Sequence, residues 1–264
     1  MARRWTSEEE GKKRKELVSL YIQQNKTIKE VGRILDIAES SVFDRMLRLG
    51  ISSIPEKKVN YRNIRHDIIL PQSFSKKLAE FVGIMLGDGH LSPTQVIVSS
   101  ALNELPYVLY ILKLAKELFG VEGRYIKREK EGAYELYIGS TVLVRYFHAM
   151  GLVSNKVRDQ VDTPKWIFKN SEYQQGFVRG FFDTDGSLYK LRFGYQMNFC
   201  NNSQPLLLSA QKTLNNLQYH PSRVSGNKFY LTRIPDLQRY AKEIGFGNLK
   251  NLEKARRFGI IGGV

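Results

Sequence analysis

The sequence has a single cysteine, Cys200, and only four histidines in 264 residues. One cysteine excludes a disulfide within the chain and a zinc site built on cysteine pairs. The histidines, His66, His90, His148 and His220, lack the spacing of a metal site. No apolar run approaches the roughly 20 residues that cross a bilayer, and the N-terminal residues lack the apolar core of a secretory signal. We therefore expect a soluble intracellular protein without a membrane span.

Acidic residues are few compared with basic ones. The chain carries 41 Lys and Arg against 26 Asp and Glu, a formal charge of +15, and its isoelectric point is near 9.8. Its length allows two or three small domains with a substantial core. The charge balance suits a polyanionic partner, nucleic acid first and an anionic membrane surface second.

One nine-residue pattern occurs twice. Residues 81–89 read FVGIMLGDG and residues 178–186 read VRGFFDTDG, with Gly third, Asp eighth and Gly ninth in each. The eighth-place acids, Asp88 and Asp185, are 97 residues apart. A single Asp-Gly pair is more often a helix stop or a turn than a metal site. Its repetition in a longer pattern, at a domain-sized spacing, favours a functional site.

Both stretches are predicted to be helices that end at their Asp-Gly pair. Gly89 and Gly186 stand where a helix takes a residue of positive φ just beyond its last turn. Ser75 can cap the first helix, and Ser171 with Gln174 has the spacing of a capping box for the second. Each Asp is therefore expected at the C-terminal end of its helix.

Glycines on these helices predict a close contact between them. Because Gly83, Gly87, Gly176 and Gly180 have no side chain, the two backbones can touch and bring the two acids together. Two carboxylates at the negative ends of two helix dipoles repel each other, and a cation would relieve the repulsion. Oxygen ligands without a His or Cys cluster favour Mg²⁺, with water and substrate phosphates completing its coordination. The pattern predicts metal-dependent hydrolysis of phosphodiesters.

At these residues the sequence resembles the LAGLIDADG homing endonucleases in their single-chain, two-repeat form. The resemblance implies that Asp88 and Asp185 are metal ligands and catalytic residues, with Mg²⁺ as the cofactor and Mn²⁺ able to replace it. It also implies that the backbone carbonyls of Gly87 and Thr184 help to hold the metals. Asp183 matches the family's sixth place, but the first copy has an apolar residue there, so Asp183 is left out of the catalytic set.

Two lysines occupy matching places in the two copies. Lys156 and Lys250 each lie five residues after a matched glycine, Gly151 and Gly245. In the family, a lysine before the last helix of each repeat lies near the scissile phosphates. The resemblance therefore implies that both lysines are catalytic, polarising water or stabilising the charge of the transition state. Asn201, near the end of a predicted strand, is a candidate for orienting the attacking water.

The predicted fold class is α+β. Two pseudo-symmetric αββαββα repeats are expected to form a DNA-binding saddle, preceded by a small all-α helix-turn-helix domain. The duplication extends beyond the nine-residue pattern, since residues 143–151 recur as residues 237–245 with the same Leu, Arg, Tyr and Gly. The expected domains are a helix-turn-helix domain at 1–52, a basic linker at 53–74, a first repeat at 75–168 and a second repeat at 169–264.

The N-terminal region shows the apolar spacing of short helices. Residues 1–15 are expected to be a frayed lead-in. Thr27 is predicted to cap a second helix and Ser40 a third, which would be the recognition helix of a helix-turn-helix. Arg45 and Arg48 on its outer face would then contact DNA. A generic small helical bundle has the same apolar spacing, but the basic outer face favours DNA contact.

Alternating residues in both repeats predict sheets with one exposed face. Residues 188–199 alternate between an aromatic and apolar set, beginning at Tyr189, and a polar and basic set. Simple solvation would explain the polar set, but Lys, Arg, Gln and Asn also read base edges and phosphates in a major groove. With the resemblance, the second interpretation is preferred. The expected DNA-binding residues are Lys190, Arg192, Gln196, Asn198, Arg223, Lys228, Arg124, Lys127, Arg128, Gln95, Arg45 and Arg48.

These features predict a monomeric, Mg²⁺-dependent, site-specific DNA endonuclease. Its partner would be double-stranded DNA, cut at a long and nearly non-palindromic site because one chain presents two similar but unequal halves. The resemblance implies 3′ overhangs and a role in intron or intein mobility. Two alternatives stay open: a WhiA-like DNA-binding regulator that has the fold without cleavage, and an intron maturase that binds RNA. Retention of both acids argues against the first, and nothing in the sequence excludes the second.

Overall fold

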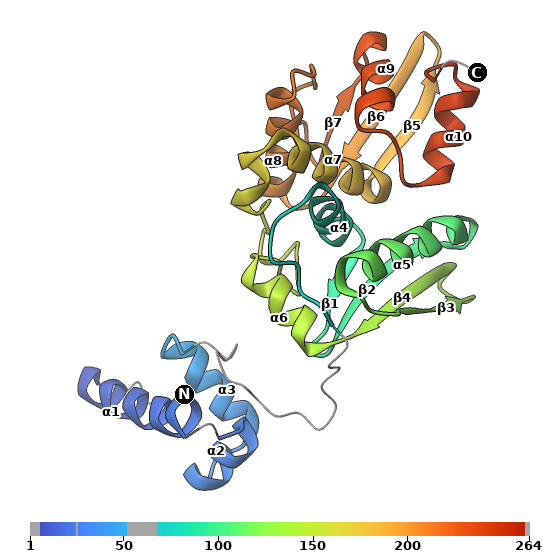
Figure 1. The fold of residues 1–264 in the computed structure, drawn as a ribbon. Coiled ribbons are helices and arrows are strands. Elements are labelled where there is room, and N and C mark those ends of the chain that lie inside the picture. The colour runs from blue at the N-terminus through green and yellow to red at the C-terminus, as the bar shows by residue number, and fades with distance from the viewer. Residues whose placement is uncertain (1–5, 25, 52–67, 262–264) are drawn as a thin grey trace. The chain divides into compact units, whose positions relative to one another are not determined.

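The computed structural model describes residues 6–24, 26–51 and 68–261. The chain divides into two compact units, residues 1–64 and residues 65–264, and each is described by itself (Figure 1). Most of the predicted basic linker at 53–74 lies outside the described residues.

The N-terminal unit is helical in its described part and has its own small core. Its elements are α1 Ser7–Leu17, a π-helical turn η1 Val18–Gln23, α2 Ile28–Leu35 and α3 Glu39–Arg48. The buried core residues are Leu17, Tyr21, Val31, Val42, Met46 and Ile51. The apolar spacing also predicts Ile34 on the inner face of α2, which is wrong because Ile34 is 53% exposed.

A capping box starts α1 earlier than predicted. The Thr6 side chain accepts a hydrogen bond from the Glu9 backbone N–H at 3.3 Å, and the Glu9 carboxylate accepts one from the Thr6 N–H at 2.8 Å. The pair satisfies two N–H groups that the first helical turn leaves open. The expectation of a frayed lead-in over residues 1–15 is therefore wrong from Ser7 onward.

The next two helices confirm one predicted cap and correct the other. Thr27 caps α2 through the same reciprocal bonds with Glu30. Asp36 then ends α2 in the left-handed conformation, with φ of 51°. Because α3 already begins at Glu39, Ser40 lies inside the helix and is not its cap.

The C-terminal unit consists of two halves, the first running from α4 to α6 and the second from α7 to α10. The first half contains α4 Lys76–Leu86, β1 Gly89–Leu91, β2 Gln95–Ala101, η2 Leu102–Glu104, α5 Leu105–Phe119, β3 Arg124–Arg128, β4 Ala133–Gly139 and α6 Thr141–Ala149. The short helix η3 Lys165–Lys169 precedes the second half, which contains α7 Ser171–Asp185, β5 Gly186–Leu191, β6 Gly194–Cys200, α8 Gln204–Asn216, β7 Lys228–Leu231, α9 Ile234–Glu243 and α10 Leu249–Arg257.

Each half combines helices with an antiparallel sheet, so the unit is α+β as predicted. The two sheets differ in size. The first sheet has the order β1-β2-β4-β3 and the second the order β5-β6-β7. In β2 and β4 the residues Val96, Val98, Leu136 and Ile138 are buried, as their alternation predicted. These side chains join a single core that spans both halves.

The second half lacks the fourth strand that an αββαββα repeat requires. Residues 221–227 run beside β7 without forming a ladder, apart from a bridge between Ser225 and Lys228. Ser222 donates its N–H to the Tyr230 carbonyl at 2.8 Å, but Tyr230 donates its own N–H to the Ser222 side-chain oxygen at 3.0 Å. A hydroxyl thus replaces the strand carbonyl, and pairing stops there.

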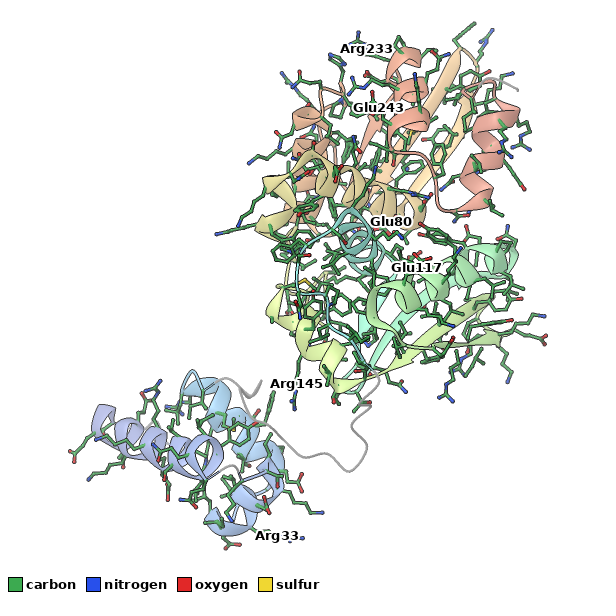
Figure 2. All side chains as sticks on the ribbon, in the orientation of Figure 1. Arg33, Glu80, Glu117, Arg145, Arg233 and Glu243 are labelled. Atoms are coloured by element: carbon green, nitrogen blue, oxygen red, sulfur yellow. The ribbon has the colours of Figure 1, made fainter. Side chains whose placement is uncertain are left out.

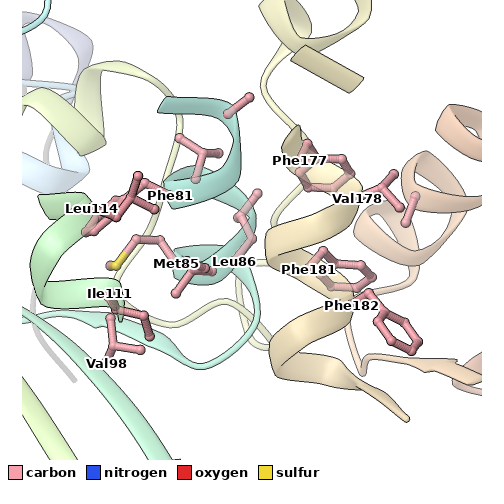
Figure 3. Packing of buried hydrophobic residues seen from close by; sticks show 14 of the residues in the cluster. Phe81, Met85, Leu86, Val98, Ile111, Leu114, Phe177, Val178, Phe181 and Phe182 are labelled. Carbon is pink, nitrogen blue, oxygen red and sulfur yellow. The ribbon is translucent and has the colours of Figure 1, made fainter. Parts of the chain in front are cut away.

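α4 and α7 form the centre of the unit, and their glycines face each other. Large side chains point the other way: Phe81 and Met85 point from α4 toward the core of the first half, and Phe182 points from α7 away from α4 (Figure 3). Phe182 packs against the Phe199 ring, with ring centroids 5.0 Å apart. Each helix therefore completes the core of its own half while its small residues meet the other helix.

A buried carboxylate crosses this contact. Glu80 of α4 lies between the two halves (Figure 2) and is only 3% exposed. It accepts a hydrogen bond from the Tyr110 hydroxyl at 2.5 Å, and the Arg179 Nε of α7 lies 3.4 Å from it. Burial raises the pKa of Glu80, while Arg179 and Tyr110 oppose the rise. The ion pair links α4 and α7 in one register.

Candidate active site at the ends of two helices

Three glycines place the backbones of α4 and α7 in direct contact, as the sequence predicted. A Cβ at Gly83 would overlap the carbonyl oxygen of Phe177, and one at Gly180 would overlap that of Glu80. A Cβ at Gly176 would likewise overlap the Lys76 carbonyl. Any larger residue would push the helices apart, so this spacing depends on glycine.

The same contact brings the two helix ends together. A Cβ at Gly87, the residue that ends α4, would overlap the Thr184 hydroxyl and lie 3.3 Å from the Asp185 carboxyl carbon. Thr184 directs its hydroxyl back to the carbonyls of Gly180 and Phe181, at 3.1 Å each. The seventh places of both repeated stretches therefore meet, and the acids that follow them lie at one junction.

The glycines after the acids are required for packing and not for a left-handed turn. Gly186 has φ of −102° and ψ of 163°, which any residue adopts, and Gly89 also lacks a positive φ. A Cβ at Gly89 would lie 2.7 Å from the Met85 sulfur, and one at Gly186 would overlap the Phe182 ring. The prediction of positive φ at both positions is wrong. Each strand instead starts so close to the preceding helix that a side chain has no room.

The helix caps differ partly from the prediction as well. Ser75 caps α4, its side chain accepting from the Leu78 N–H at 3.1 Å. At α7 the cap is Asn170, whose side chain accepts from the Glu172 N–H at 2.7 Å. Ser171 is already the first helical residue, so the predicted capping box with Gln174 is wrong by one position.

Both acids resist ionisation in this environment. The Asp88 side chain opens to solvent, yet the surrounding protein removes enough water to raise its pKa to about 6. Lys156 opposes this rise. Burial raises the pKa of Asp185 to about 7, and the nearby negative charge of Asp88 contributes to that rise. Two carboxylates whose ionisation is opposed by burial, and for Asp185 also by its neighbour, make a site that a cation would stabilise.

Lys156 brings a positive charge to the junction. Its ammonium group donates a short hydrogen bond to the Gly87 carbonyl and a second, of 3.3 Å, to the Met85 carbonyl. Burial lowers the pKa of Lys156, while the charges of Asp185 and Asp88 favour its protonated form. An ammonium group among these oxygens shows that they can accept a cation.

Asn201 contacts the second acid. Its side-chain amide donates to the Asp185 carboxylate, and its own oxygen accepts from the Ser203 N–H at 2.7 Å. The amide is thus fixed at both ends. It orients the Asp185 side chain, which is a different contact from the water that the sequence predicted for it.

Lys250 lies near the site but has a partner of its own. Its ammonium group is 2.7 Å from the Glu104 carboxylate, which also accepts from the Asn248 amide at 3.0 Å and from the Ser100 hydroxyl at 2.8 Å. Both Glu104 and Lys250 are close enough to influence the pKa of Asp88, in opposite directions. Sequence reasoning missed Glu104, since the second copy has no matching acid.

Asp183 forms hydrogen bonds that stabilise the fold next to the junction. It is buried, accepts hydrogen bonds from the Gly247 N–H at 2.5 Å and the Asn251 amide at 3.1 Å, and its pKa is raised to about 7 by burial. These bonds hold the start of α10, the helix that carries Lys250. Asp183 therefore fixes the chain at the start of α10.

The donor set fits a divalent ion only if other ligands join it. Across the described residues, no group of three or more His, Cys, Asp and Glu side chains gathers around one point. Asp88, Asp185 and the Gly87 carbonyl supply oxygen atoms, the type that Mg²⁺ prefers. Water and phosphate oxygens would have to complete the coordination, as is usual for Mg²⁺.

The predicted DNA-facing residues of the second half are divided by a hairpin turn. Leu191 pairs with Gly194, so residues 192 and 193 form a two-residue turn within the alternating run. Because the chain reverses there, Lys190 shares the face of buried Leu188 and not that of Gln196. The expectation of one continuous polar set is therefore wrong at Lys190, and it puts Tyr189 on the wrong face as well.

One face of the second sheet still collects polar residues. Gln196 and Asn198 of β6 point to the side opposite the core, together with Tyr230 and Lys228 of β7. Arg192 lies in the turn, with its guanidinium 5.1 Å from the centre of the Phe193 ring. The predicted set also includes Arg223, which is exposed on the irregular segment before β7.

The predicted DNA-facing residues of the first half also lie on two different faces of their sheet. Gln95, Arg124 and Arg128 lie on the face opposite the core, and Arg128 donates to Glu135 at 2.8 Å. Lys127 pairs with Tyr134 on the other face, which contradicts its expected place.

In the N-terminal unit, the predicted contacts lie on α3. Arg48 forms an ion pair of 2.9 Å with Glu10 of α1, and Arg45 is half-buried. The Arg48 side chain therefore holds α3 to α1 in this structure.

Comparison with known proteins identifies a domain in the second half. A family model described as a LAGLIDADG-like domain matches residues 172–245. One component of the A-type ATP synthase of Pyrococcus abyssi is 32% identical over 120 residues, which are 45% of this chain and 11% of that protein. The replication factor C small subunit of Methanocaldococcus jannaschii is 25% identical over 126 residues, 48% of this chain and 7% of that protein. The chain spans a small part of these relatives, so their named activities are not carried over.

Two solved structures show partial similarity to this chain. One, of mesophilic variants from the homing endonuclease I-DmoI, has 19% sequence identity and a TM-score of 0.47 and covers 64% of this chain and 95% of that one. Another, of the N-terminal LAGLIDADG domain of DUF199/WhiA, has 15% identity and a TM-score of 0.48 and covers 67% and 86%. The described residues of this chain include no helix with the length and apolarity that a membrane span needs.

Proposed function

We propose that this chain, whose residues 172–245 match a LAGLIDADG-like domain, binds double-stranded DNA and hydrolyses both strands with the help of divalent metal ions. One observation carries the proposal. Asp88 and Asp185, far apart in sequence, meet at the ends of two helices whose glycine backbones touch, beside the ammonium group of Lys156. Mg²⁺ is the proposed cofactor, with Mn²⁺ able to replace it.

The residues of the junction would divide the work of phosphodiester hydrolysis. Asp88 and Asp185 would hold the metal with the carbonyls of Gly87 and Thr184, and the bound metal would polarise the scissile phosphate and the attacking water. Asn201 would keep the Asp185 carboxylate in place. Lys156 would stabilise the negative charge that develops on the phosphate.

DNA would lie against the exposed faces of the two sheets. Gln196, Asn198 and Lys228 on the second sheet and Gln95 and Arg124 on the first have the side chains that contact bases and phosphates. The two halves differ in sequence, so a single chain would recognise a long site without true palindromic symmetry. The N-terminal unit, with Arg45 on α3, would add contacts as a helix-turn-helix.

A second function is favoured by the setting of Lys250. Its ammonium group is paired with Glu104, which leaves less positive charge for a phosphate in that half. A chain that binds DNA without cutting both strands, as a WhiA-like regulator would, fits this arrangement. Cleavage therefore has to be measured separately from binding.

The test compares cleavage and binding in the same variants. A plasmid with the joined flanks of the coding element is incubated with the protein in Mg²⁺ or in EDTA. Asp88→Asn and Asp185→Asn are expected to abolish cleavage and to retain DNA binding, whereas Asp159→Asn, at an exposed acid paired with Arg158, should change neither. An Asp88→Asn protein that still cuts both strands would disprove the site. Binding without cleavage by the unaltered chain would favour the regulator.

A further inference from the structure

The β5–β6 hairpin is longer than its counterpart in the first half. The two hairpins match up to the pairs Leu91 with Val96 and Leu188 with Met197, whose side chains are all buried. Four residues join the first of these pairs, whereas residues 189–196 join the second. At about 3.3 Å per residue, the second hairpin reaches about 7 Å farther.

The added tip is aromatic and basic. The Phe193 ring is 84% exposed, the largest exposure among the large hydrophobic residues of the described chain, and Leu191 beside it is 40% exposed. Lys190 and Arg192 are also exposed, and the Arg192 guanidinium lies over the Phe193 ring. No acidic residue occurs from Gly186 to Cys200. An exposed phenyl ring gives this fold no core contact, so its surroundings indicate a role in binding.

The first half shows that the fold does not require such a tip. Its matching loop is Ser92-Pro93-Thr94, without an aromatic or a basic residue, and the β1–β2 pairing forms without them. The cationic aromatic tip is therefore a property of one half only. Because the tip lies beyond the matched part of the sheet, it can contact a bound molecule that extends past the sheet face.

We propose that the Arg192-Phe193 tip is a DNA wedge, in which the Phe193 ring stacks on a base at a distorted step while Arg192 and Lys190 contact phosphates. This inference rests on the proposed function only for its partner, DNA. Aromatic rings stack on bases of any sequence, and apolar side chains inserted at base steps are known to kink a duplex. The basic neighbours fit a polyanion, which a basic or neutral protein surface would not provide. DNA that contacted only the face of the sheet would not contact the Phe193 ring.

Binding to two short fluorescein-labelled duplexes tests the wedge. One is fully paired and of mixed sequence, and the other has the same sequence with a central unpaired base. The wild-type chain is expected to prefer the duplex with the unpaired base, because stacking there costs less unpairing. Phe193→Ala should weaken binding to that duplex by about 5-fold or more, with the salt dependence unchanged. Arg192→Ala should instead reduce the slope of log K against log salt by about 0.9.

Two further variants keep the result interpretable. Leu208→Ala removes another exposed apolar side chain, on α8, and should bind both duplexes as the wild type does. Phe193→Trp should retain the preference, and its added emission should be quenched by the duplex with the unpaired base. If Phe193→Ala binds both duplexes like Leu208→Ala, the wedge is wrong while DNA binding stands. If no variant, nor the wild type, binds either duplex, the proposed function fails together with this partner.

Discussion

Replacing Gly180 with Ala should force the two central helices apart. The new Cβ would overlap the carbonyl oxygen of Glu80 and lie 2.9 Å from the Ile84 nitrogen. Both are backbone atoms of a buried helix, so neither can rotate away as the end of a side chain could. Since a carbon and an oxygen normally stay about 3.3 Å apart, the helices would have to separate by about 1 Å.

The expected loss of stability is large for one methyl group. Overpacking a core costs about 1–3 kcal/mol, and a gap of about 1 Å also removes a quarter to a half of the dispersion energy along the contact. The better helix propensity of Ala offsets about 1 kcal/mol of this. We expect a net loss of about 3 kcal/mol in the free energy of unfolding. Because Gly87 and Asp185 would separate too, cleavage should fall by about 100-fold.

Urea unfolding followed by Trp166 fluorescence measures this loss in the C-terminal unit. Trp166 is buried and stacks on Phe74 with ring centroids 4.2 Å apart, and a Trp5→Phe background removes the other tryptophan signal. Gly139→Ala is the matched control, because a Cβ there meets nothing within 4 Å and its φ is not positive. Equal midpoints for the Gly180 and Gly139 variants would refute the backbone contact.

Three other changes probe the charges of the site. An acid whose pKa rises on folding destabilises the fold when it ionises, so Asp185, with a pKa of about 7 in the folded chain, costs stability above about pH 7 and nothing below about pH 4. Asp185→Asn should therefore raise the free energy of unfolding of the metal-free chain by a few kcal/mol at about pH 8, and by nothing below about pH 4. The same difference between the variant and the unaltered chain at about pH 8 and about pH 4 would contradict this. Lys156→Met removes a cation from the Gly87 carbonyl and should tighten Tb³⁺ binding, measured by luminescence without DNA, by about 5-fold; weaker binding would show that the ammonium does not compete. Glu104→Gln leaves Lys250 without its ion pair and should lower the unfolding free energy by about 1 kcal/mol in thermal scans, since the Lys250 side chain is partly exposed. An unchanged melting temperature would disprove this.

The contact between α4 and α7 could be predicted because it depends on local sterics. Gly83 and Gly180 lie at the same place in two copies of one pattern, and only small residues let two helix backbones touch. Repetition gave Lys156 and Lys250 matching places, but it could not show that Glu104 pairs with only one of them. The reason for a glycine at position 89 could not be predicted, since a residue without a side chain suits a left-handed turn and a tight contact equally well. Only the folded chain shows that Met85 fills the space beside Gly89.

The direction of the chain within the second sheet was not readable from alternation. A two-residue turn changes which alternate positions face the core, so even-numbered Leu188 and odd-numbered Met197 are both buried. The turn residues Arg192 and Phe193 are not the Asn-Gly or Asp-Gly pairs that usually mark such a turn. Reading the run as one strand without this turn assigns the side chains on one side of the turn to the opposite face. That is why Lys190 was assigned to the wrong side while Gln196 was not.

The two halves repeat the backbone but not the electrostatics. Lys156 and Lys250 stand at the same spacing after a glycine, which alone predicts equal roles. In the structure, the Lys156 ammonium group contacts carbonyl oxygens at the junction, whereas that of Lys250 is paired with Glu104 from the other half. A carboxylate within 2.7 Å offsets much of the field that a lysine exerts on a nearby phosphate. The two lysines therefore have different partners, and under the proposed function the two strands of a bound duplex would meet chemically unequal sites even though the scaffolds match.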